Sequence, residues 1–305
     1  MSENAPVVIF CYRRKITKLI DSLIENRESK NTELFIYSDG FKSNIDKKDV
    51  INLRKDLKKI HGFKSVYVIE SDKNNGLANS VIKGVNDIIK KFGKIIVLED
   101  DLIVSQYFLN FMNRSLSLYN ENKNIWSISG YSPKIPYLKN CKKEIYFSLR
   151  SSSWGWATWL DRWQKVDWTI SNFEDFKKNK EKIKNFERGG NDMFKMLELQ
   201  YLGKIDSWAI RWCYSQFLHS AYSVTPKISM TKNEGFSDNL GSHNFGKDNR
   251  WKVEILKSKI DNIETSFDSN IAHHFKKYHD MSFYTRCGYF LRKWGGYNLI
   301  KNFLK

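Results

Sequence analysis

The stretch Lys94-Ile-Ile-Val-Leu-Glu-Asp-Asp101 decides how the rest of the chain is interpreted. Its unbroken apolar run, 95–98, predicts a short strand that is covered on both faces. Three carboxylates follow at the strand's C-terminal end, where open α/β sheets place their ligands. Adjacent carboxylates repel one another unless a cation lies among them, so the stretch predicts a divalent metal held chiefly by Asp101. The alternative is a solvated acidic turn after a strand.

The composition narrows the class of protein. The chain has 305 residues, 41% of them hydrophobic, which is enough for one large domain or two small ones. Lys and Arg number 51 against 34 Asp and Glu, a net charge of +17. That charge favours a polyanionic partner: nucleic acid, an anionic membrane surface or a phosphate-bearing substrate. Four scattered cysteines predict free thiols, and the absence of a long apolar run predicts a cytoplasmic protein, either free or peripheral on the membrane.

The N-terminal half alternates between two periodicities. Apolar runs typical of strands and apolar residues at helical spacing follow each other four times. This alternation predicts an α/β fold with a parallel sheet and right-handed crossovers. The expected strands are 7–12, 34–38, 66–69 and 94–99, and the expected helices are 16–24, 50–60, 77–89 and 108–116, the last capped by Ser105.

Four polar residues follow the C-terminal ends of these strands: Arg13, Asp39, Asn74 and Asp101. Parallel strands end at one edge of the sheet, so these side chains should share one rim. A cation, two carboxylates and an amide suit a nucleotide diphosphate with its metal. Neither common Gly-rich phosphate loop is present, which argues against P-loop NTPases and dinucleotide oxidoreductases.

The C-terminal half is irregular after about residue 125. Strands are expected at 125–128 and 145–148, a solvated lysine-rich helix at 173–188 and another helix at 193–202. Between them, 151–163 holds four tryptophans in ten residues, which predicts either platforms that stack on sugars or bases or an aromatic mini-core. His243 lies in a Gly- and Asn-rich loop and is a candidate ligand.

The C-terminal tail, 273–305, combines basic and aromatic residues. It contains seven Lys and Arg residues against Asp280 alone, so 7 − 1 gives +6 before histidines. Such a segment suits the surface of an anionic leaflet. The alternative is a C-terminal helix that packs on the domain.

Four pieces of the chain, taken together, resemble the GT-A nucleotide-sugar glycosyltransferases of the broad family 2 group, which is common in bacterial polysaccharide clusters. They are Val7–Arg13, Asn74-Asn-Gly-Leu77, Glu99-Asp-Asp101, and the series from Trp154-Gly-Trp156 to Asn233 and Gly241-Ser-His243. The Glu-Asp-Asp also resembles the variant DXD motif of the N-acetylglucosaminyltransferases that begin complex N-glycans.

The resemblance implies a metal-dependent transfer of a sugar, with inversion, from a nucleotide donor to a glycan or lipid-linked acceptor. It implies a nucleotide-sugar half at 1–124, an acceptor half at 125–272 and a separate tail. Mn²⁺ or Mg²⁺ would be held by Asp101, with His243 as a further ligand or a group that closes over the diphosphate. The implied donor-binding residues are Phe10, Tyr12, Arg13, Asp39, Asn74, Gly76, Glu99 and Asp100, and the implied acceptor-binding residues are Trp154, Trp156, Trp208 and Arg211.

Asp206 is the predicted catalytic base. It precedes a tryptophan-bearing segment, and Trp208 would help to dry the site and raise the carboxylate's pKa. Similar transferases place their base in this position, and Arg211 would steady it or contact the acceptor. Asp206 as a helix N-cap is the structural alternative. Glu234 and Asp238 are the reserve candidates.

Two other classes of function compete with this interpretation. A nucleotidyltransferase or pyrophosphorylase also uses acids at a strand end, but it usually needs a Gly-rich basic N-terminal loop, and Phe10–Arg13 has no glycine. A basic nucleic-acid-binding protein is suggested by the charge and the tryptophans. No nucleic-acid module is recognisable, so we expect no nucleic-acid partner.

Overall fold

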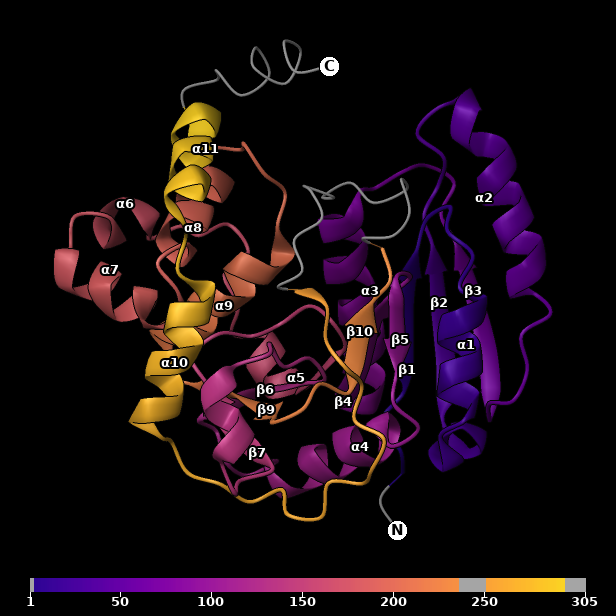
Figure 1. The fold of residues 1–305 in the computed structure, drawn as a ribbon. Helices are drawn as coiled ribbons and strands as arrows, with labels where there is room; N and C mark the ends of the chain where they lie inside the picture. Colours follow the sequence, from indigo (N-terminus) through magenta and orange to yellow (C-terminus); the bar gives the residue numbers. More distant parts are fainter. Residues whose placement is uncertain (1–2, 236–250, 294–305) are drawn as a thin grey trace.

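A computed structural model describes residues 3–235 and 251–293, and it is built on one large mixed sheet (Figure 1). Its eight strands lie in the order β3-β2-β1-β4-β8-β6-β9-β7. Strands β8 and β7 run opposite to the other six, so the sheet is mostly parallel. The strands are β1 (Val7–Cys11), β2 (Glu33–Ser38), β3 (Ser65–Glu70), β4 (Lys94–Glu99), β6 (Ile125–Ser129), β7 (Ile145–Ser148), β8 (Trp156–Trp159) and β9 (Tyr222–Pro226).

The predicted α/β fold is confirmed, because helices cover both faces of this sheet. The four N-terminal strands come at the expected places and are all parallel. The longer helices are α1 (Thr17–Ile24), α2 (Asn44–Leu57), α3 (Leu77–Phe92), α4 (Phe108–Leu118), α8 (Met193–Tyr201), α9 (Trp208–Leu218), α10 (Ser269–His279) and α11 (Phe283–Lys293). Both halves of the chain contribute to the sheet, since β4 pairs with β8.

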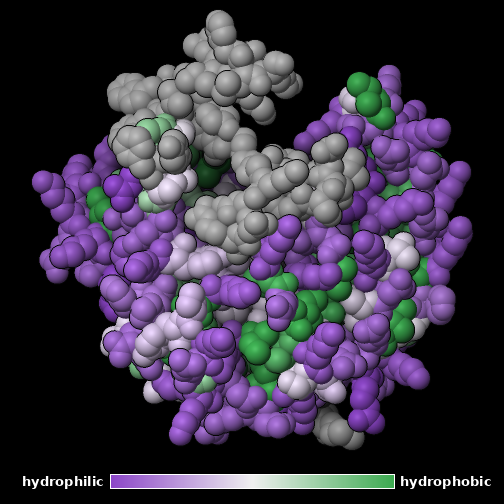
Figure 2. Space-filling view, viewed as in Figure 1, coloured by the Kyte–Doolittle hydropathy of each residue, from purple (hydrophilic) through white to green (hydrophobic). Residues whose placement is uncertain are grey.

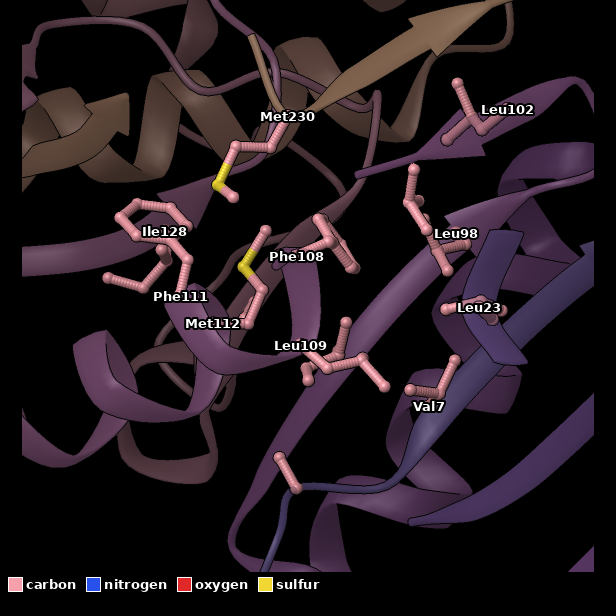
Figure 3. Close-up of a cluster of buried hydrophobic side chains, with 14 of the residues drawn as sticks. Val7, Leu23, Leu98, Leu102, Phe108, Leu109, Phe111, Met112, Ile128 and Met230 are labelled. Atoms are coloured by element: carbon pink, nitrogen blue, oxygen red, sulfur yellow. The ribbon is translucent and has the colours of Figure 1, made fainter. Parts of the chain in front are cut away.

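Strand alternation explains why the apolar runs are continuous. In β4, Ile96 and Leu98 face a core that contains α1 and α4, whereas Ile95 and Val97 face a core that contains α3 and α9. Figure 3 shows the first core, where Leu98 and Val7 of the sheet meet Leu23 of α1 and the apolar face of α4. Burial of both faces fixes the register of β4 and therefore the direction in which the following acids point.

Two local predictions were wrong, and one small sheet was not predicted. Ser105 does not cap α4, because Tyr107 is the N-cap and the Ser105 hydroxyl accepts the Tyr107 N–H at 3.2 Å. The expected solvated helix at 173–188 is two short helices, α6 (Phe173–Phe176) and α7 (Lys180–Phe186), whose phenylalanines are buried. A two-stranded sheet of β5 (Leu102–Val104) and β10 (Thr231–Asn233) was not foreseen.

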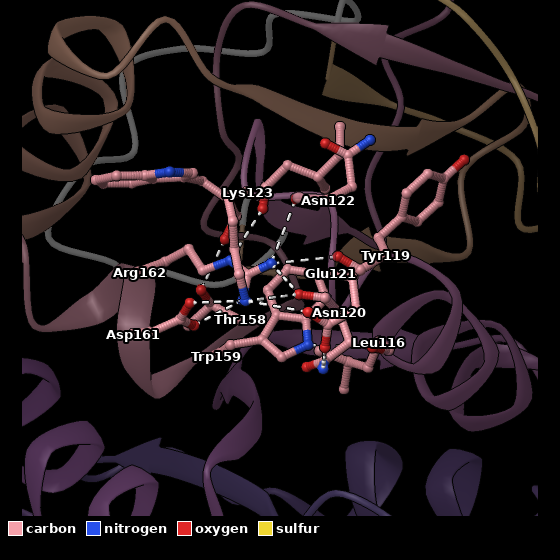
Figure 4. Close-up of polar contacts among 12 residues, drawn as sticks. Leu116, Tyr119, Asn120, Glu121, Asn122, Lys123, Thr158, Trp159, Asp161 and Arg162 are labelled. Atoms are coloured by element: carbon pink, nitrogen blue, oxygen red, sulfur yellow. Dashed lines mark hydrogen bonds and ion pairs between the residues drawn. The ribbon is translucent and has the colours of Figure 1, made fainter.

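Arg162 joins the two halves of the molecule (Figure 4). Its side chain is 2% exposed, and its guanidinium donates to the carbonyl oxygens of Ile125, Tyr119 and Asn122 at 3.2–3.3 Å. It also pairs with Asp161 at 2.6 Å. The start of α5 (Leu160–Trp163) is therefore fixed to the turn between α4 and β6.

The described part of the tail packs on the domain. Phe275 of α10 and Tyr289 of α11 are buried, and Lys293 pairs with Glu198 of α8 at 2.7 Å. This matches the packing alternative for 273–293, and 294–305 lie outside the described residues. Within the described part of the chain, no helix is both long and apolar enough to cross a membrane. All four cysteines are free thiols, as expected.

Candidate functional site

The C-terminal ends of β1, β2 and β4 open into one cleft of about 1260 Å³. This exceeds the roughly 300–1,000 Å³ of a usual small-molecule pocket, so the cleft has room for two ligands. All four residues of the predicted rim line it. The predicted site residues that line the cleft are Phe10, Tyr12, Arg13, Asp39, Asn74, Gly76, Glu99, Asp100, Asp101, Trp154, Asp206 and Trp208.

An arginine lies among the three carboxylates that follow β4. Arg14 Nη1 is 2.8 Å from Asp100 Oδ1 and 3.7 Å from Asp101 Oδ2. Asp100 also accepts the Tyr12 N–H at 3.2 Å, and Asp101 accepts the Asn233 amide at 2.8 Å. Arg14 therefore supplies part of the positive charge that the three carboxylates require. This residue was not selected from the sequence.

Burial changes the protonation of this acidic cluster. Burial, together with the charges of Asp101 and Asp100, raises the pKa of Glu99 well above its usual value. A hydrogen bond from Trp208 opposes this rise. Burial raises the pKa of Asp100 to about 6, although Arg14 acts in the opposite direction. Glu99 therefore ionises less readily than an ordinary glutamate, which suits a hydrogen bond to a ligand better than ligation of a metal.

The described residues alone fit a metal only if a ligand shares it. Within 3–235 and 251–293 there is no cluster of three or more His, Cys, Asp or Glu side chains that could hold an ion. Asp101 nevertheless brings carboxylate oxygens to the cleft, and Mg²⁺ sites commonly combine one or two carboxylates with substrate phosphates. The predicted ligand His243 and the reserve base Asp238 lie outside the described residues.

Asp39 shapes the loop beside the cleft. The residue is 8% exposed, and its carboxylate accepts the N–H groups of Gly40, Asn75 and Gly76 at 2.9–3.1 Å. Gly76 has a φ of 77°, a conformation that favours glycine. Asp39 thus positions the loop that carries Asn74 and Gly76, in addition to lining the cleft.

Tyr12 and Arg13 share a partner that the sequence did not reveal. Asp46, at the start of α2, accepts the Tyr12 hydroxyl at 2.6 Å and pairs with Arg13 at 3.2 Å. The Tyr12 hydrogen bond lowers the pKa of Asp46. Asp46 comes 33 positions after Arg13, and only the three-dimensional fold brings the two together.

The tryptophan stretch divides between core and cleft. Trp156 is 1% exposed, and its ring centroid is 4.9 Å from that of Trp208 and 5.6 Å from that of Trp163. Its predicted contact with an acceptor was therefore wrong, because strand β8 turns this side chain into the core. Trp154 lines the cleft and meets Tyr131 edge to face at 4.5 Å. Trp208 belongs to the core cluster and also lines the cleft.

Asp206 faces the cleft from the start of α9. A Cβ atom added to Gly76 would lie 3.8 Å from Asp206 Oδ2, so the two elements meet across the cleft. Asp206 is not the helix cap, because Ser207 is the N-cap and accepts the Ile210 N–H at 3.4 Å. The expected drying by Trp208 is not seen, since the Asp206 side chain is 59% exposed.

Arg211 supports the helix start and does not line the cleft. Its guanidinium donates to the carbonyl oxygens of Ser207 at 3.2 Å and Trp168 at 3.1 Å, and Nη2 is 3.5 Å from Asp206 Oδ1. Its contacts allow it to steady Asp206, and its contact with the acceptor stays a prediction. The reserve base Glu234 pairs with Lys232 at 2.7 Å and Lys18 at 3.4 Å.

Comparisons with known proteins give little support for any one activity. No protein-family model matches the sequence, and no curated protein matches it. Among solved structures, a UDP-glucose pyrophosphorylase complexed with UDP-glucose aligns with 76% of this chain and 94% of its own, at 10% identity and a TM-score of 0.38. A likeness of this size does not assign an activity, so the functional argument depends on the cleft.

Proposed function

We propose that the chain is a GT-A glycosyltransferase that moves a sugar from a nucleotide-sugar donor to a glycan or lipid-linked acceptor hydroxyl. One observation carries the proposal: the carboxylates after β4 and Asp206, from the second half of the chain, line the same cleft. Its volume suits a donor and an acceptor together. The sugar would lie between these two acidic groups, with its anomeric carbon accessible from the side of Asp206.

The donor end would use residues 1–124. Phe10, Tyr12 and Arg13 would surround the base and ribose, and the loop held by Asp39 would cover the sugar phosphate. Arg14 adds a cation where a diphosphate would meet the acidic stretch. A divalent cation, Mn²⁺ or Mg²⁺, held by Asp101 and the diphosphate oxygens, and in part by His243, would supply Lewis acidity to the leaving group.

The transfer step would be a direct displacement. The acceptor oxygen forms a bond to the anomeric carbon while the bond from that carbon to the diphosphate oxygen breaks, and the nucleoside diphosphate leaves. Asp206 accepts the proton of the acceptor hydroxyl, and Arg211 keeps its carboxylate in place. Glu99, whose pKa is raised by burial, would contact the sugar by a hydrogen bond. Attack from the side opposite the leaving group inverts the anomeric configuration.

A thermal-shift screen of UDP, GDP, dTDP and CMP sugars, with and without Mn²⁺, tests the donor end. A radiolabelled donor then separates the two enzyme classes that use such a cleft. The proposal expects the label in a glycoside and free nucleoside diphosphate. Labelled sugar 1-phosphate and nucleoside triphosphate, formed only when pyrophosphate is added, would make the protein a pyrophosphorylase.

Membrane docking remains part of the proposal for a lipid-linked acceptor. Lys277 of α10 and Arg286 of α11 are exposed cations, on helices where Phe275 and Tyr289 are buried. Figure 2 shows one largely hydrophilic face of the molecule. Cosedimentation of the full chain with phosphatidylglycerol vesicles should fall in the double variant Lys277→Glu, Arg286→Glu. An unchanged bound fraction in this variant would contradict docking through these helices.

A further inference from the structure

The cleft continues away from the predicted donor end into a second arm. The donor end is built by β1, β2 and β4, whereas this arm is bounded by β7, α8, α10 and α11, on the opposite side of the molecule from α2 (Figure 1). Arg150, Asp192 and Lys195 line the arm together with Phe275, His279 and Tyr289. The reaction described above uses none of them.

The far wall of the arm is fixed in place by the turn before α8. Asn191 N–H donates to Asp280 at 3.0 Å, and Met281 N–H donates to the Asn191 side chain at 2.7 Å. Gly190 has a φ of 137°, and a Cβ atom there would lie 2.8 Å from the Cβ atom of His279. The junction of α10 and α11 is therefore held tightly against this turn, so the arm is a formed feature of the fold.

Arg150 presents unused donors to the arm. Nη1 pairs with Asp192 Oδ1 at 2.7 Å, which fixes the guanidinium plane. Among the described residues, Nη2 contacts the Met196 sulfur at 3.9 Å, and a thioether is a weak acceptor. The Arg150 side chain is 17% exposed and lines the cleft. A planar guanidinium with free N–H groups matches the two oxygens of a carboxylate or phosphate.

Lys195 adds a second cation to the same arm. It comes from α8, one turn after Asp192, and its ammonium lies 5.9 Å from the ring centroid of Tyr289. Its recorded hydrogen bond is a long one, 3.5 Å to the Asn191 carbonyl oxygen. The charged side chains that line this arm are thus two cations, Arg150 and Lys195, and one carboxylate, Asp192. The charged side chains that line the arm therefore carry a net positive charge next to aromatic surface, and the Glu187 carboxylate lies within electrostatic range of Lys195.

We propose that this arm binds an acidic group on the acceptor, a sugar carboxylate or phosphate, through Arg150 and Lys195. Asp192 is a positioning residue that holds the guanidinium. The inference rests on the proposed function, because it treats the arm as the acceptor end of a transferase. The acceptor would then be an acidic saccharide. Its charge would account for two cations that lie away from the proposed diphosphate position.

Ligand-observed NMR titrations of the full chain test this with three probes: methyl β-glucuronide, glucose 6-phosphate and neutral methyl β-glucoside. We expect at least one acidic probe to bind about tenfold or more tightly than the glucoside, the usual gain from a charge-assisted contact. The tighter acidic probe tells a carboxylate from a phosphate ligand. Equal affinities for all three probes would overturn the proposal.

Single substitutions test whether the preference for acidic probes arises in the arm. Lys195→Gln and Arg150→Gln should each remove most of the acidic preference, while Lys184→Gln, an exposed lysine on α7, should keep it. If Arg150→Gln does not fold, Lys195→Gln decides alone, and an unchanged preference in that variant refutes the assignment. Nucleotide-sugar binding is titrated separately. If the protein prefers acidic probes but binds no nucleotide sugar, the arm is an anion-binding site and the proposed transferase activity is refuted.

Discussion

The two ends of the cleft are built in different ways. At the proposed donor end, short loops follow parallel strands, and two arginines pair with carboxylates, Arg14 with Asp100 and Arg13 with Asp46. At the acceptor end, the walls come from helices far apart in sequence, and the Asp206 carboxylate is 59% exposed. The donor end is thus preorganised around its charges, whereas the acceptor end offers a reactive group that a second ligand must cover.

The largest expected effect tests the donor end. Asp101→Ala should abolish turnover and Mn²⁺-dependent nucleotide binding, because the cleft would lose the carboxylate proposed to hold the metal. Turnover assays and nucleotide titrations with Mn²⁺ or EDTA measure both. The control is Asp49→Ala, an exposed acid on α2. Full activity of the Asp101 variant in EDTA would contradict the metal assignment.

The next test concerns the acceptor end. Asp206→Asn should lower kcat by about 10²-fold or more with the donor KM little changed, the usual size of a general-base effect. Steady-state kinetics with varied donor measure this. The matched control is Asp161→Asn, whose carboxylate pairs with Arg162 outside the cleft. A near-normal kcat for Asp206→Asn would move the assignment to Glu234 or Asp238.

Two tryptophans two positions apart separate core from site. Trp156→Ala should lower the free energy of unfolding by about 3–5 kcal/mol, because it removes a fully buried ring. Trp154→Ala should cost less stability and weaken acceptor binding, because Trp154 lines the cleft. Urea unfolding and the acceptor KM measure the pair. Similar stability losses in both variants would mean that the stretch is all core.

The smallest effect is a dependence of stability on pH. The pKa of Asp100 rises from 3.8 to about 6 on folding, which corresponds to about 3 kcal/mol. A raised carboxyl pKa means that the folded state binds more protons, so stability falls as pH increases from about 4 through 6. Burial also raises the pKa of Glu99, so the ionisation of Glu99 adds to this loss of stability.

Glu99→Gln should therefore raise the free energy of unfolding at pH 8 and leave it little changed at pH 4, in EDTA. Urea unfolding at several pH values measures the difference, and exposed Glu121→Gln is the control. Equal stability changes at both pH values would show that burial does not hold Glu99 protonated.

The sequence predicted where the strand-end residues lie better than where the side chains of the C-terminal half lie, for a physical reason. Strand ends can be located from apolar runs, and parallel strands bring Arg13, Asp39, Asn74 and Asp101 to one edge. The pairing of Asp46 with Tyr12, and of Arg150 with Asp192, joins residues more than 30 positions apart. A tryptophan-rich stretch likewise does not show which rings point inward. Trp156 is buried because it lies in strand β8.

The sheet that both halves share has a consequence for how the protein unfolds. Strand β4 carries the acids of the donor end and pairs with β1 on one edge and with β8, from the second half, on the other. A fragment that stops at residue 124 would leave the second edge of β4 unpaired, and unpaired edges of apolar strands associate with other chains. We therefore expect a single cooperative unfolding transition, and a donor half that does not survive as an independent, soluble module.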